Sequence, residues 1–224
     1  MFINVSAESI TVSDDWERAS LKQIEEIAHY PVALIGDVLQ RLGMMASAIH
    51  HVAGKASFYG TVLPIQTWEG DNLAIHRALD DAKPGDVLVI NGNGETNRAV
   101  FGDLLGEVCL ARQVAAVVID GAVRDIEELS VMELPTYARA VNPAGPSKYG
   151  PGQVGAPVAC GNVVCNPGDA ILGDRDGIIV ISRHLVPSLA EKLKVQVGIE
   201  NTFREKVRAS IRQAPSASTK KEMF

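Results

Sequence analysis

The stretch AAVVIDGAVRD, residues 115–125, decides the fold that we expect for this chain. Its first part, residues 115–119, is a short uninterrupted apolar run, which is typical of a strand that is buried on both faces of a sheet. A second run of this kind, residues 87–90, follows the turn Pro84-Gly85-Asp86. Helical patterns separate these strands, and this alternation predicts an α/β core that is built in layers.

The segments on both sides of this stretch carry their own start and stop signals. We expect a first helix at Ser13, because the Ser13 hydroxyl can cap it and Asp14 and Asp15 complement the positive end of its dipole. A second helix follows Pro31, which suits a first helical turn, and ends at Gly43. The other expected elements are a strand over 60–68, helices over 72–82 and 103–112, and a short helix that residues 120–125 open toward Met132. Strands are expected near 158, 163–164 and 178–181, followed by a helix over 185–211 in which an interruption would fall near Gly198.

The chain is expected to form one domain. Its length of 224 residues is in the usual range for a single domain. Residues 142–157 hold four Pro and four Gly, too many for a regular element, so we expect an ordered loop that covers or flanks the core. The expected domain comprises residues 1–213, with helices at both ends, and residues 214–224 are expected to form a disordered tail.

The composition argues against several classes of protein. The chain has 27 acidic and 21 basic residues and no Lys/Arg stripe, so we expect no nucleic-acid partner. No apolar stretch approaches the roughly 20 residues that cross a bilayer, and the N-terminus lacks a secretory pattern, so we expect no membrane association and a cytoplasmic location. Cys109, Cys160 and Cys165 lack CxxC spacing, which indicates buried free thiols rather than disulfides or a thiolate zinc site.

Two junctions between a strand and a helix carry candidate site residues. Gly102-Asp103 opens a helix, where the backbone N–H groups of Leu104 and Leu105 lack helical partners and could hold a carboxylate. Arg124 and Asp125 end a buried strand, a common position for sites in α/β proteins. Arg124 offers a planar fork for a carboxylate or an oxyanion, and Asp125 offers an oxygen ligand for Mg²⁺ or Mn²⁺. Each pair also has an ordinary alternative, a helix cap for the first and a surface ion pair for the second.

Other polar features have ordinary interpretations. His76, on the helix expected over 72–82, is interpreted as a packing or interface residue. Residues 91–97 are rich in Asn and Gly, which are common turn formers, although this loop could also contact a substrate. Asp174 and Asp176 match only a fragment of a calcium loop, so a hairpin turn is the favoured interpretation.

Taken together, the two junctions resemble a known family signature. Gly102-Asp103, twenty intervening residues and Arg124-Asp125 match the G-D-x20-R-D signature of the class II pyruvate aldolases. These are the 4-hydroxy-4-methyl-2-oxoglutarate and 4-carboxy-4-hydroxy-2-oxoadipate aldolases, which are related to the RraA-like regulators of ribonucleases. The resemblance is collinear over about residues 25–205. The segments that carry it are residues 32–39, 71–76, 84–89, 118–125, 166–169, 173–174 and 176–177.

The resemblance implies a fold, an assembly and a set of site residues. The fold would be a β/β/α layered sandwich similar to the phosphohistidine swivelling domain, assembled as a homotrimer or as a hexamer made of two trimers, with sites at subunit interfaces. Asp125 would bind a divalent metal, Mg²⁺ or Mn²⁺, directly, and Asp103 would bind it through water. Arg124 and the amides of Leu104 and Leu105 would hold the pyruvyl part of the substrate.

The resemblance also implies a role for the C-terminal helix. Glu200, followed four residues later by Arg204, looks like the family's Lys-Glu-x3-Arg element. By this resemblance, Glu200 would reach the metal-bound waters of a neighbouring subunit. The residue before it is Ile199 where the family has Lys, so this chain departs from the pattern at that position.

The implied activity is retro-aldol cleavage of a 4-hydroxy-2-oxo di- or tricarboxylic acid such as 4-hydroxy-4-methyl-2-oxoglutarate, with oxaloacetate decarboxylation as a side activity. Both reactions leave an enolate of pyruvate, which a divalent cation and the guanidinium of Arg124 would stabilise. The alternative is a regulator that binds and inhibits a ribonuclease without catalysis. Asp103 favours the enzyme, because a docking protein does not need a second acidic residue in register with Arg124-Asp125.

Overall fold

The computed structural model describes residues 6–13 and 15–213. Helices and strands are mixed along the chain, which is the arrangement expected of an α/β protein. The strands are β1 (Ile10–Val12), β2 (His50–Ala53), β3 (Phe58–Thr67), β4 (Asp86–Asn91), β5 (Ala99–Phe101), β6 (Ala116–Val123), β7 (Thr136–Val141), β8 (Gly152–Val154), β9 (Val158–Cys160), β10 (Val163–Cys165), β11 (Ala170–Asp174) and β12 (Gly177–Ile181). The helices are α1 (Leu21–Glu25), α2 (Val32–Val38), α3 (Leu73–Asp81), α4 (Asp103–Ala111), α5 (Ile126–Val131) and α6 (Val186–Gln213).

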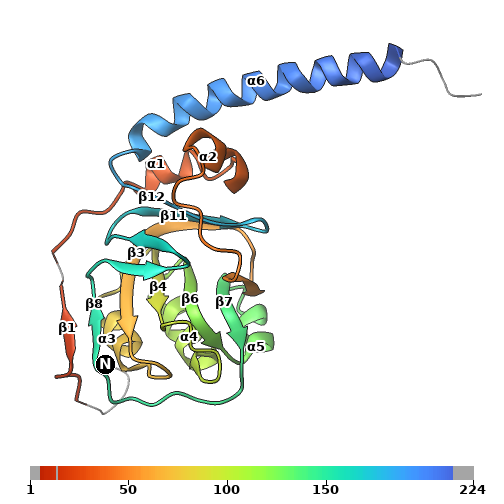
Figure 1. Ribbon diagram of the computed structural model, residues 1–224. Coiled ribbons are helices and arrows are strands. Elements are labelled where there is room, and N and C mark those ends of the chain that lie inside the picture. The colour runs from red at the N-terminus through yellow and green to blue at the C-terminus, as the bar shows by residue number, and fades with distance from the viewer. Residues whose placement is uncertain (1–5, 14, 214–224) are drawn as a thin grey trace, which may run out of the picture.

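One mixed sheet organises the molecule (Figure 1). Its main path runs β1-β8-β3-β4-β6-β7-β2, while β5 pairs with β6, and β11 pairs with both β3 and β12. The neighbours β3, β4, β6 and β7 run parallel to one another, and β9 and β10 form a separate antiparallel pair. Because parallel strands end at the same edge of a sheet, the residues that follow them gather at that edge.

The central strands bury both of their faces. Along β4, Leu88 and Ile90 pack in one cluster with α3, α4 and α5, whereas Val87 and Val89 pack in a second cluster with β9 to β12. This alternation follows from the two-residue period of a strand. The uninterrupted apolar runs in the sequence are therefore explained by a sheet that is covered on both sides.

A third apolar cluster lies on the outer side of β11 and β12. Ile24 of α1, Ile35 of α2 and Leu189 of α6 are buried there, together with Leu172 and Ile179 of the two strands. The layers therefore run from α3, α4 and α5, through the central sheet and β9 to β12, to α1, α2 and the start of α6 (Figure 1). The predicted α/β class and its β/β/α layering are confirmed, with a further helical layer outside.

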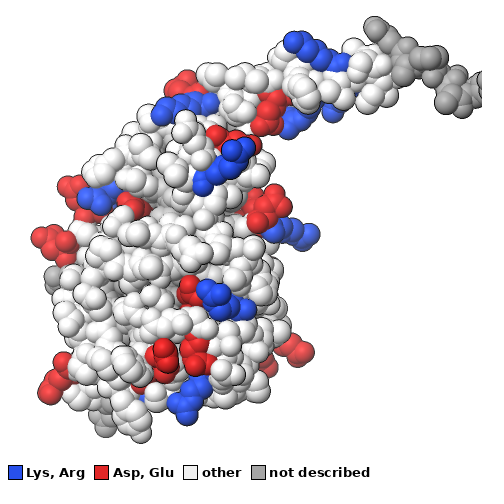
Figure 2. All heavy atoms as spheres, in the orientation of Figure 1, with Lys and Arg blue, Asp and Glu red and all other residues white. Residues whose placement is uncertain are grey.

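The C-terminal helix continues well beyond the body of the molecule. α6 is buried as far as Leu193 and still packs against the body at Val197, and from there it projects into solvent (Figure 1). It passes through Gly198 as one helix, so no interruption is found at that residue. None of the helices within the described residues is long and apolar enough to cross a membrane. On the face shown in Figure 2, basic side chains lie beside acidic ones rather than in one basic patch.

The helix expected at Ser13 is wrong for the described residues. After Ser13 the chain stays without regular structure from residue 15 until α1 begins, and Asp14 lies outside the described residues. Tertiary contacts explain the difference. The guanidinium of Arg18 makes two hydrogen bonds, of 2.8 and 2.9 Å, to the carboxylate of buried Asp86. Such contacts outweigh a local capping signal.

Two other segments show where local sequence signals end. α2 ends at Val38 rather than at Gly43, and Gly43 makes a later turn with a φ of +82°. A Cβ at Gly43 would lie 2.1 Å from the Val180 carbonyl oxygen, so the position requires glycine. Residues 142–157 are ordered as expected, and within them β8 pairs with both β1 and β3.

Candidate active site at the ends of β5 and β6

β5 and β6 bring the two motif junctions together at the carboxyl edge of the sheet. β5 pairs in parallel with the end of β6, so the two strands finish side by side. The Arg124 N–H donates to the Phe101 carbonyl at 3.0 Å, and the Asp103 N–H donates to Asp125 Oδ2 at 3.3 Å. The residues between the motifs, 104–123, form nearly all of α4 and all of β6. α4 is the crossover that the parallel neighbours β5 and β6 require.

Asp125 has an unusual backbone conformation. Its φ of +56° lies in the left-handed region, which is uncommon for residues with a side chain but tolerated best by Asn and Asp. Its Oδ2 also accepts a hydrogen bond from Arg124 Nε at 3.1 Å. Its other oxygen, Oδ1, has no hydrogen-bond partner among the described residues. The carboxylate is thus held by one oxygen and presents the other.

Gly102 is required at its position for a steric reason. A Cβ built there would lie 2.3 Å from Asp125 Oδ2 and 3.0 Å from Arg124 Cγ. Any side chain would therefore displace the carboxylate or the guanidinium stem. The φ of Gly102 is −162°, an extended value that every residue adopts. Glycine is therefore favoured by the lack of space for a Cβ and not by the backbone angle.

The start of α4 offers one free amide of the two that were predicted. The Leu104 N–H donates to Asp103 Oδ1 at 2.7 Å, so it is already engaged by its own neighbour. The first helical bond runs from Gly106 N–H to the Gly102 carbonyl, which leaves the Leu105 N–H without a partner among the described residues. Together with the helix dipole, this amide favours an anion at the N-terminus of α4.

A cavity of about 150 Å³ adjoins this arrangement. Its wall includes the start of α4 and Arg124, together with Asn72, His76 and Lys148. Asn72 precedes α3, His76 lies in α3, and Lys148 lies in the segment 142–157. The sequence prediction treated His76 as a packing residue and did not single out the other two. The available signals were weak, namely an Asn at a helix start and a lone cation in a loop.

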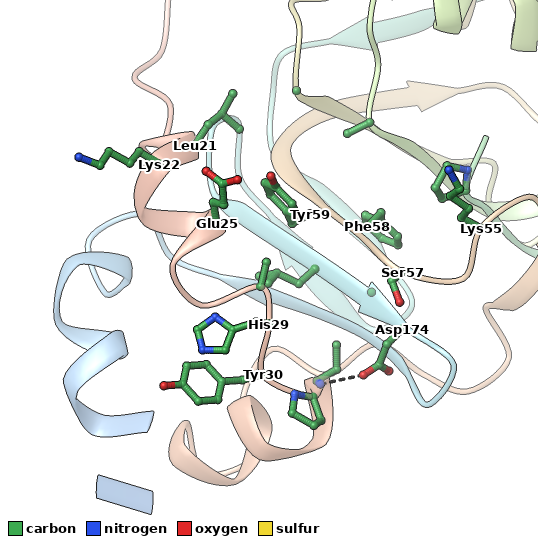
Figure 3. Close-up of a pocket in the computed structure, with 18 residues that line it drawn as sticks. Leu21, Lys22, Glu25, His29, Tyr30, Lys55, Ser57, Phe58, Tyr59 and Asp174 are labelled. Atoms are coloured by element: carbon green, nitrogen blue, oxygen red, sulfur yellow. Dashed lines mark hydrogen bonds between the residues drawn. The ribbon is translucent and has the colours of Figure 1, made fainter. Parts of the chain in front are cut away.

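A larger cavity lies elsewhere, at the opposite edge of the sheet, and is shown in Figure 3. It has a volume of about 1000 Å³ and is lined by α1, the start of α2, β3, β11 and the residues just before β4, β6 and β7. Its acidic groups already have partners, because Asp174 Oδ2 accepts the Val32 N–H at 2.9 Å and Glu25 interacts with Tyr59. Burial and the Glu25 carboxylate raise the pKa of Tyr59. The smaller cavity combines the unpaired Leu105 N–H and the Arg124 guanidinium with the Asp103 carboxylate, so we place the candidate site there.

The cysteines lie outside the candidate site. Cys109, Cys160 and Cys165 are buried and free, as predicted. Burial raises the pKa of Cys109 and of Cys160, and it raises the pKa of Cys165 to about 12. Thiols of this kind stay protonated at neutral pH, which argues against a nucleophilic cysteine.

Comparison with known proteins identifies the family. A model of the RraA-like family, described as Aldolase/RraA, matches residues 11–180. The chain belongs to the RraA-like family. A relative from Halalkalibacterium halodurans, named "Putative 4-hydroxy-4-methyl-2-oxoglutarate aldolase", is 33% identical over 177 residues, which cover 79% of this chain and 84% of the relative.

Solved structures of RraA-like proteins share the fold. The RNA-processing inhibitor RraA from Thermus thermophilis has a TM-score of 0.64 and 28% identity, over 68% of this chain and 93% of the other. RraAS2 from Streptomyces coelicolor, from the RNase ES inhibitor RraA protein family, has a TM-score of 0.77 and 23% identity, over 85% of this chain and 99% of the other. The match to the Streptomyces coelicolor structure covers most of this chain, so the two proteins share the fold over most of their length.

The donor set of this RraA-like site suits a hard divalent cation. No group of three or more His, Cys, Asp or Glu side chains comes together among the described residues. Asp103 and Asp125 nevertheless offer two carboxylates on residues that contact each other, since the Asp103 N–H donates to Asp125 Oδ2, and Asp125 Oδ1 has no partner among the described residues. Mg²⁺ is commonly held by one or two carboxylates and completes its shell with waters and substrate oxygens. The carboxylates of Asp103, which lines the cavity, and of Asp125, which contacts Asp103 and Arg124, therefore fit such an ion.

Glu200 does not join this RraA-like site within one chain. It lies on the projecting part of α6, where its Oε2 accepts a hydrogen bond from Arg204 at 2.6 Å. Figure 1 shows α6 at the end of the molecule away from α4 and α5. The geometry of one chain thus brings together Asp103, Arg124 and Asp125 but leaves Glu200 apart. The predicted contact of Glu200 with a neighbouring subunit stays a prediction.

Proposed function

We propose that this RraA-like protein is a divalent-metal-dependent lyase that cleaves a 4-hydroxy-2-oxo di- or tricarboxylic acid, such as 4-hydroxy-4-methyl-2-oxoglutarate, and releases pyruvate. One observation carries the proposal, namely that Asp103, Arg124 and Asp125 meet at the N-terminus of α4 beside a cavity. The name of the Halalkalibacterium halodurans relative supports the same reaction class. We propose oxaloacetate decarboxylation as a side activity of the same site.

The reaction needs a place for negative charge. When the C3–C4 bond of the substrate breaks, its electron pair moves towards the C2 oxygen and gives the enolate of pyruvate. The guanidinium of Arg124 is held by the Asp125 carboxylate at 3.1 Å and supplies a fixed positive partner for that oxygen. The free Leu105 N–H and the dipole of α4 hold the C1 carboxylate. Decarboxylation of oxaloacetate produces the same enolate, which explains how one site serves both reactions.

The proton balance is simple. The C4 hydroxyl loses its proton as C4 becomes a carbonyl, and the enolate later takes a proton at C3. Asp103 is the acidic group of this chain that we assign to organise the water that moves these protons, because its Oδ2 has no partner among the described residues. A Schiff base is not part of the proposal, since no lysine amine is needed to accept the electrons.

A divalent cation, Mg²⁺ or Mn²⁺, would be held by Asp125 directly and by Asp103 through water, and it would supply Lewis-acid stabilisation of the developing charge. Asp125 Oδ1 faces no competing partner among the described residues and is therefore the oxygen available for this contact. Both ions prefer oxygen ligands, so the donor set alone does not choose between them.

A regulatory function is the competing candidate. The solved RNA-processing inhibitor from Thermus thermophilis is 28% identical to this chain, and the same fold could dock on a ribonuclease. The position of Asp103 favours the enzyme. A protein that acts only by docking has no need for an acidic residue placed against Arg124 and Asp125 beside a cavity.

The test measures pyruvate release from 4-hydroxy-4-methyl-2-oxoglutarate and from oxaloacetate, with Mg²⁺, with Mn²⁺ and with EDTA. We expect turnover that EDTA abolishes and that added metal restores. Asp125→Asn keeps an acceptor oxygen and tolerates the left-handed backbone, so it should retain the fold but lower kcat/KM by at least about a hundredfold.

The matched control is Asp37→Asn, an exposed carboxylate with only a long ion pair of 3.9 Å to Arg41. This variant should keep both turnover and thermal midpoint. Arg124→Ala should lower turnover far more than stability. Absence of metal-dependent turnover on both substrates, or full activity in Asp125→Asn, would contradict the proposed function and favour the regulator.

A further inference from the structure

The cavity in Figure 3 is separate from the candidate active site, and the proposed chemistry does not use it. It lies at the amino ends of β4, β6 and β7, whereas Arg124 and Asp125 follow the carboxyl end of β6. Its volume of about 1000 Å³ is at the upper end of the range in which proteins hold small organic molecules. The cavity therefore has the size of a second binding site.

Aromatic side chains line two sides of this cavity. Phe58 and Tyr59 line it from β3, and His29 and Tyr30 line it from the segment between α1 and α2. The rings of His29 and Tyr30 lie against each other, with their centroids 4.0 Å apart. Figure 3 shows the four side chains around one space. Leu21 of α1 and Leu172 of β11 add aliphatic surface. Such walls suit a ligand with an apolar body.

The Phe58 end of the wall is fixed by packing and by hydrogen bonds. A Cβ on Gly173 would lie 2.1 Å from Phe58 Cε1, so β11 has no side chain where this ring lies. The Phe58 ring also meets the Tyr137 ring edge-on, with centroids 5.4 Å apart. The Tyr137 hydroxyl lies 2.5 Å from the Ala56 carbonyl oxygen and 2.6 Å from that of Asp174. It thus joins the segment before β3 to the end of β11, and a wall held in this way lowers the entropy cost of binding.

Two carboxylates in the wall keep a negative charge that no ion pair compensates. Glu25 of α1 points toward Tyr59 in Figure 3 and interacts with its hydroxyl. Asp174 accepts the Val32 N–H at 2.9 Å and the Asp176 N–H at 2.9 Å. These partners are neutral, and neither carboxylate makes an ion pair among the described residues. The negative charge of both groups therefore remains available to a ligand.

The two lysines of the wall do not cancel this charge. Lys55 forms an ion pair of 2.6 Å with Glu133, which does not line the cavity. Lys22 is exposed and is directed away from Tyr59 in Figure 3. The cavity thus combines aromatic rings with net negative charge. Organic cations are bound by this combination, because both carboxylates and the faces of aromatic rings attract positive charge.

We propose that this cavity binds an organic cation, namely an ammonium group on an aromatic or branched aliphatic body. The ammonium group lies at the Glu25 carboxylate and the Tyr59 ring, and the apolar body lies against Phe58 and Leu172. An anion of the same shape is repelled by Glu25 and Asp174. This site is independent of the proposed lyase function, since it shares no residue with the candidate active site.

Three probes that share a naphthyl body test the charge of the ligand. They are 2-naphthylmethylamine, 2-naphthylmethanol and 2-naphthoate, which are cationic, neutral and anionic at neutral pH. Isothermal titration calorimetry on the full chain measures their affinities. We expect the amine to bind at least about fivefold more tightly than the alcohol, and the naphthoate to bind least. Equal affinity for amine and alcohol, tighter binding of the anion, or no binding by all three would overturn the proposal.

Two variants assign the binding to this cavity. Glu25→Gln removes the charge but keeps the shape, so the amine should bind as weakly as the alcohol, whose affinity should not change. Ser57→Trp places a large side chain in the wall and should weaken both probes at least about fivefold. Ser57 is exposed, so the variant should fold, and its thermal midpoint checks this.

Glu26→Gln is the matched control for the charge. Glu26 is the exposed neighbour of Glu25 in the chain and does not line the cavity, so this variant should bind the amine like wild type. Amine affinity that is unchanged in Glu25→Gln, or that falls equally in Glu26→Gln, would show that the cation is not held at Glu25 and would overturn the site.

Discussion

At the scale of single residues, the distance between Gly102 and Asp125 is the tightest constraint in the candidate site. A side chain at Gly102 has no free space, since its Cβ would lie 2.3 Å from Asp125 Oδ2. We predict that Gly102→Ala displaces the Asp125 carboxylate, lowers the free energy of unfolding by about 1–3 kcal/mol and abolishes metal-dependent pyruvate release. Chemical denaturation measures the first effect and the lyase assay measures the second.

Gly198 provides the matched control for this substitution. It lies in the exposed part of α6, and a Cβ there would meet no atom within 4 Å. Gly198→Ala should therefore stabilise the protein by about 0.5–1 kcal/mol, because alanine favours the helix, and should leave turnover unchanged. Full activity and unchanged stability in Gly102→Ala would show that the carboxylate has room to move and that the geometry around Gly102 is not critical.

The sequence was informative about single site residues only where a motif was present. Asp103, Arg124 and Asp125 follow strands in a recognisable spacing, and the structure places them together. Asn72 and Lys148 carry no motif. They reach the cavity because residues 70–72 pair with the loop around Ser147, a contact between segments that are far apart in the chain. Local patterns contain no information about such a pairing.

At the scale of secondary structure elements, Asp71 joins the start of α3 to the loop that carries Lys148. Asp71 is 1% exposed, and its carboxylate accepts hydrogen bonds from the Leu73 and Tyr149 amides and from the Ser147 hydroxyl. Burial alone would raise the pKa of Asp71, but these hydrogen bonds outweigh burial and hold the pKa below the ordinary value of 3.8. Ionised Asp71 therefore stabilises the folded state.

We predict that Asp71→Asn lowers the free energy of unfolding at neutral pH by about 1–3 kcal/mol, because the amide cannot accept all of these hydrogen bonds. The sign of the pH dependence follows from the lowered pKa. The stabilisation is complete above the unfolded-state pKa and is lost as the pH falls through the folded-state pKa. The difference between wild type and variant should therefore shrink as the pH falls from about 6 to about 3. Urea titrations across this range measure it.

Asp176→Asn is a suitable comparison, since Asp176 lies in an exposed turn between β11 and β12. This variant should follow wild type at every pH. A loss in Asp71→Asn that stays constant down to pH 3 would show that Asp71 acts through packing rather than through its charge.

Elements differed in how well the sequence predicted them. β4, β6, α3 and α4 were located within a few residues, because long apolar runs or helical periods sit between clear turn signals. Short strands such as β5 and β7 were not predicted, because their three to six residues are specified by pairing with β6 rather than by a pattern of their own. The false helix at Ser13 has the same cause, since contacts across the chain decide that segment.

At the scale of the whole molecule, the projecting part of α6 carries apolar side chains that pack against nothing else among the described residues. The projecting part of α6 exposes Val195, Ile199, Phe203 and Ile211, each at least 59% exposed. Glu200 lies among them and away from the Asp125 carboxylate. A site that uses both residues therefore needs two chains. We propose that the protein assembles as a homotrimer or as two trimers, with Glu200 of one subunit beside Asp125 of the next.

This arrangement predicts complementation between inactive variants. Asp125→Asn and Glu200→Gln should each be inactive alone, but co-expression should restore activity, because some interfaces then pair an intact Asp125 with an intact Glu200. In a ring of heterologous interfaces formed at random from equal amounts, one interface in four is intact, and in a mixed trimer one in three is intact. About a quarter to a third of wild-type activity should therefore return. Two affinity tags isolate the mixed assemblies, and pyruvate release measures them.

Arg124→Ala supplies the decisive control for the mixing experiment. Arg124 and Asp125 belong to the same half of the site, so a mixture of Arg124→Ala with Asp125→Asn leaves no interface in which one subunit carries both intact residues. That mixture should stay inactive even though it assembles equally well. If the Asp125 and Glu200 variants also stay inactive in doubly tagged assemblies, or if Glu200→Gln is active alone, then α6 contributes no group to a neighbouring site. Its exposed apolar residues would then have to be explained by packing between subunits alone.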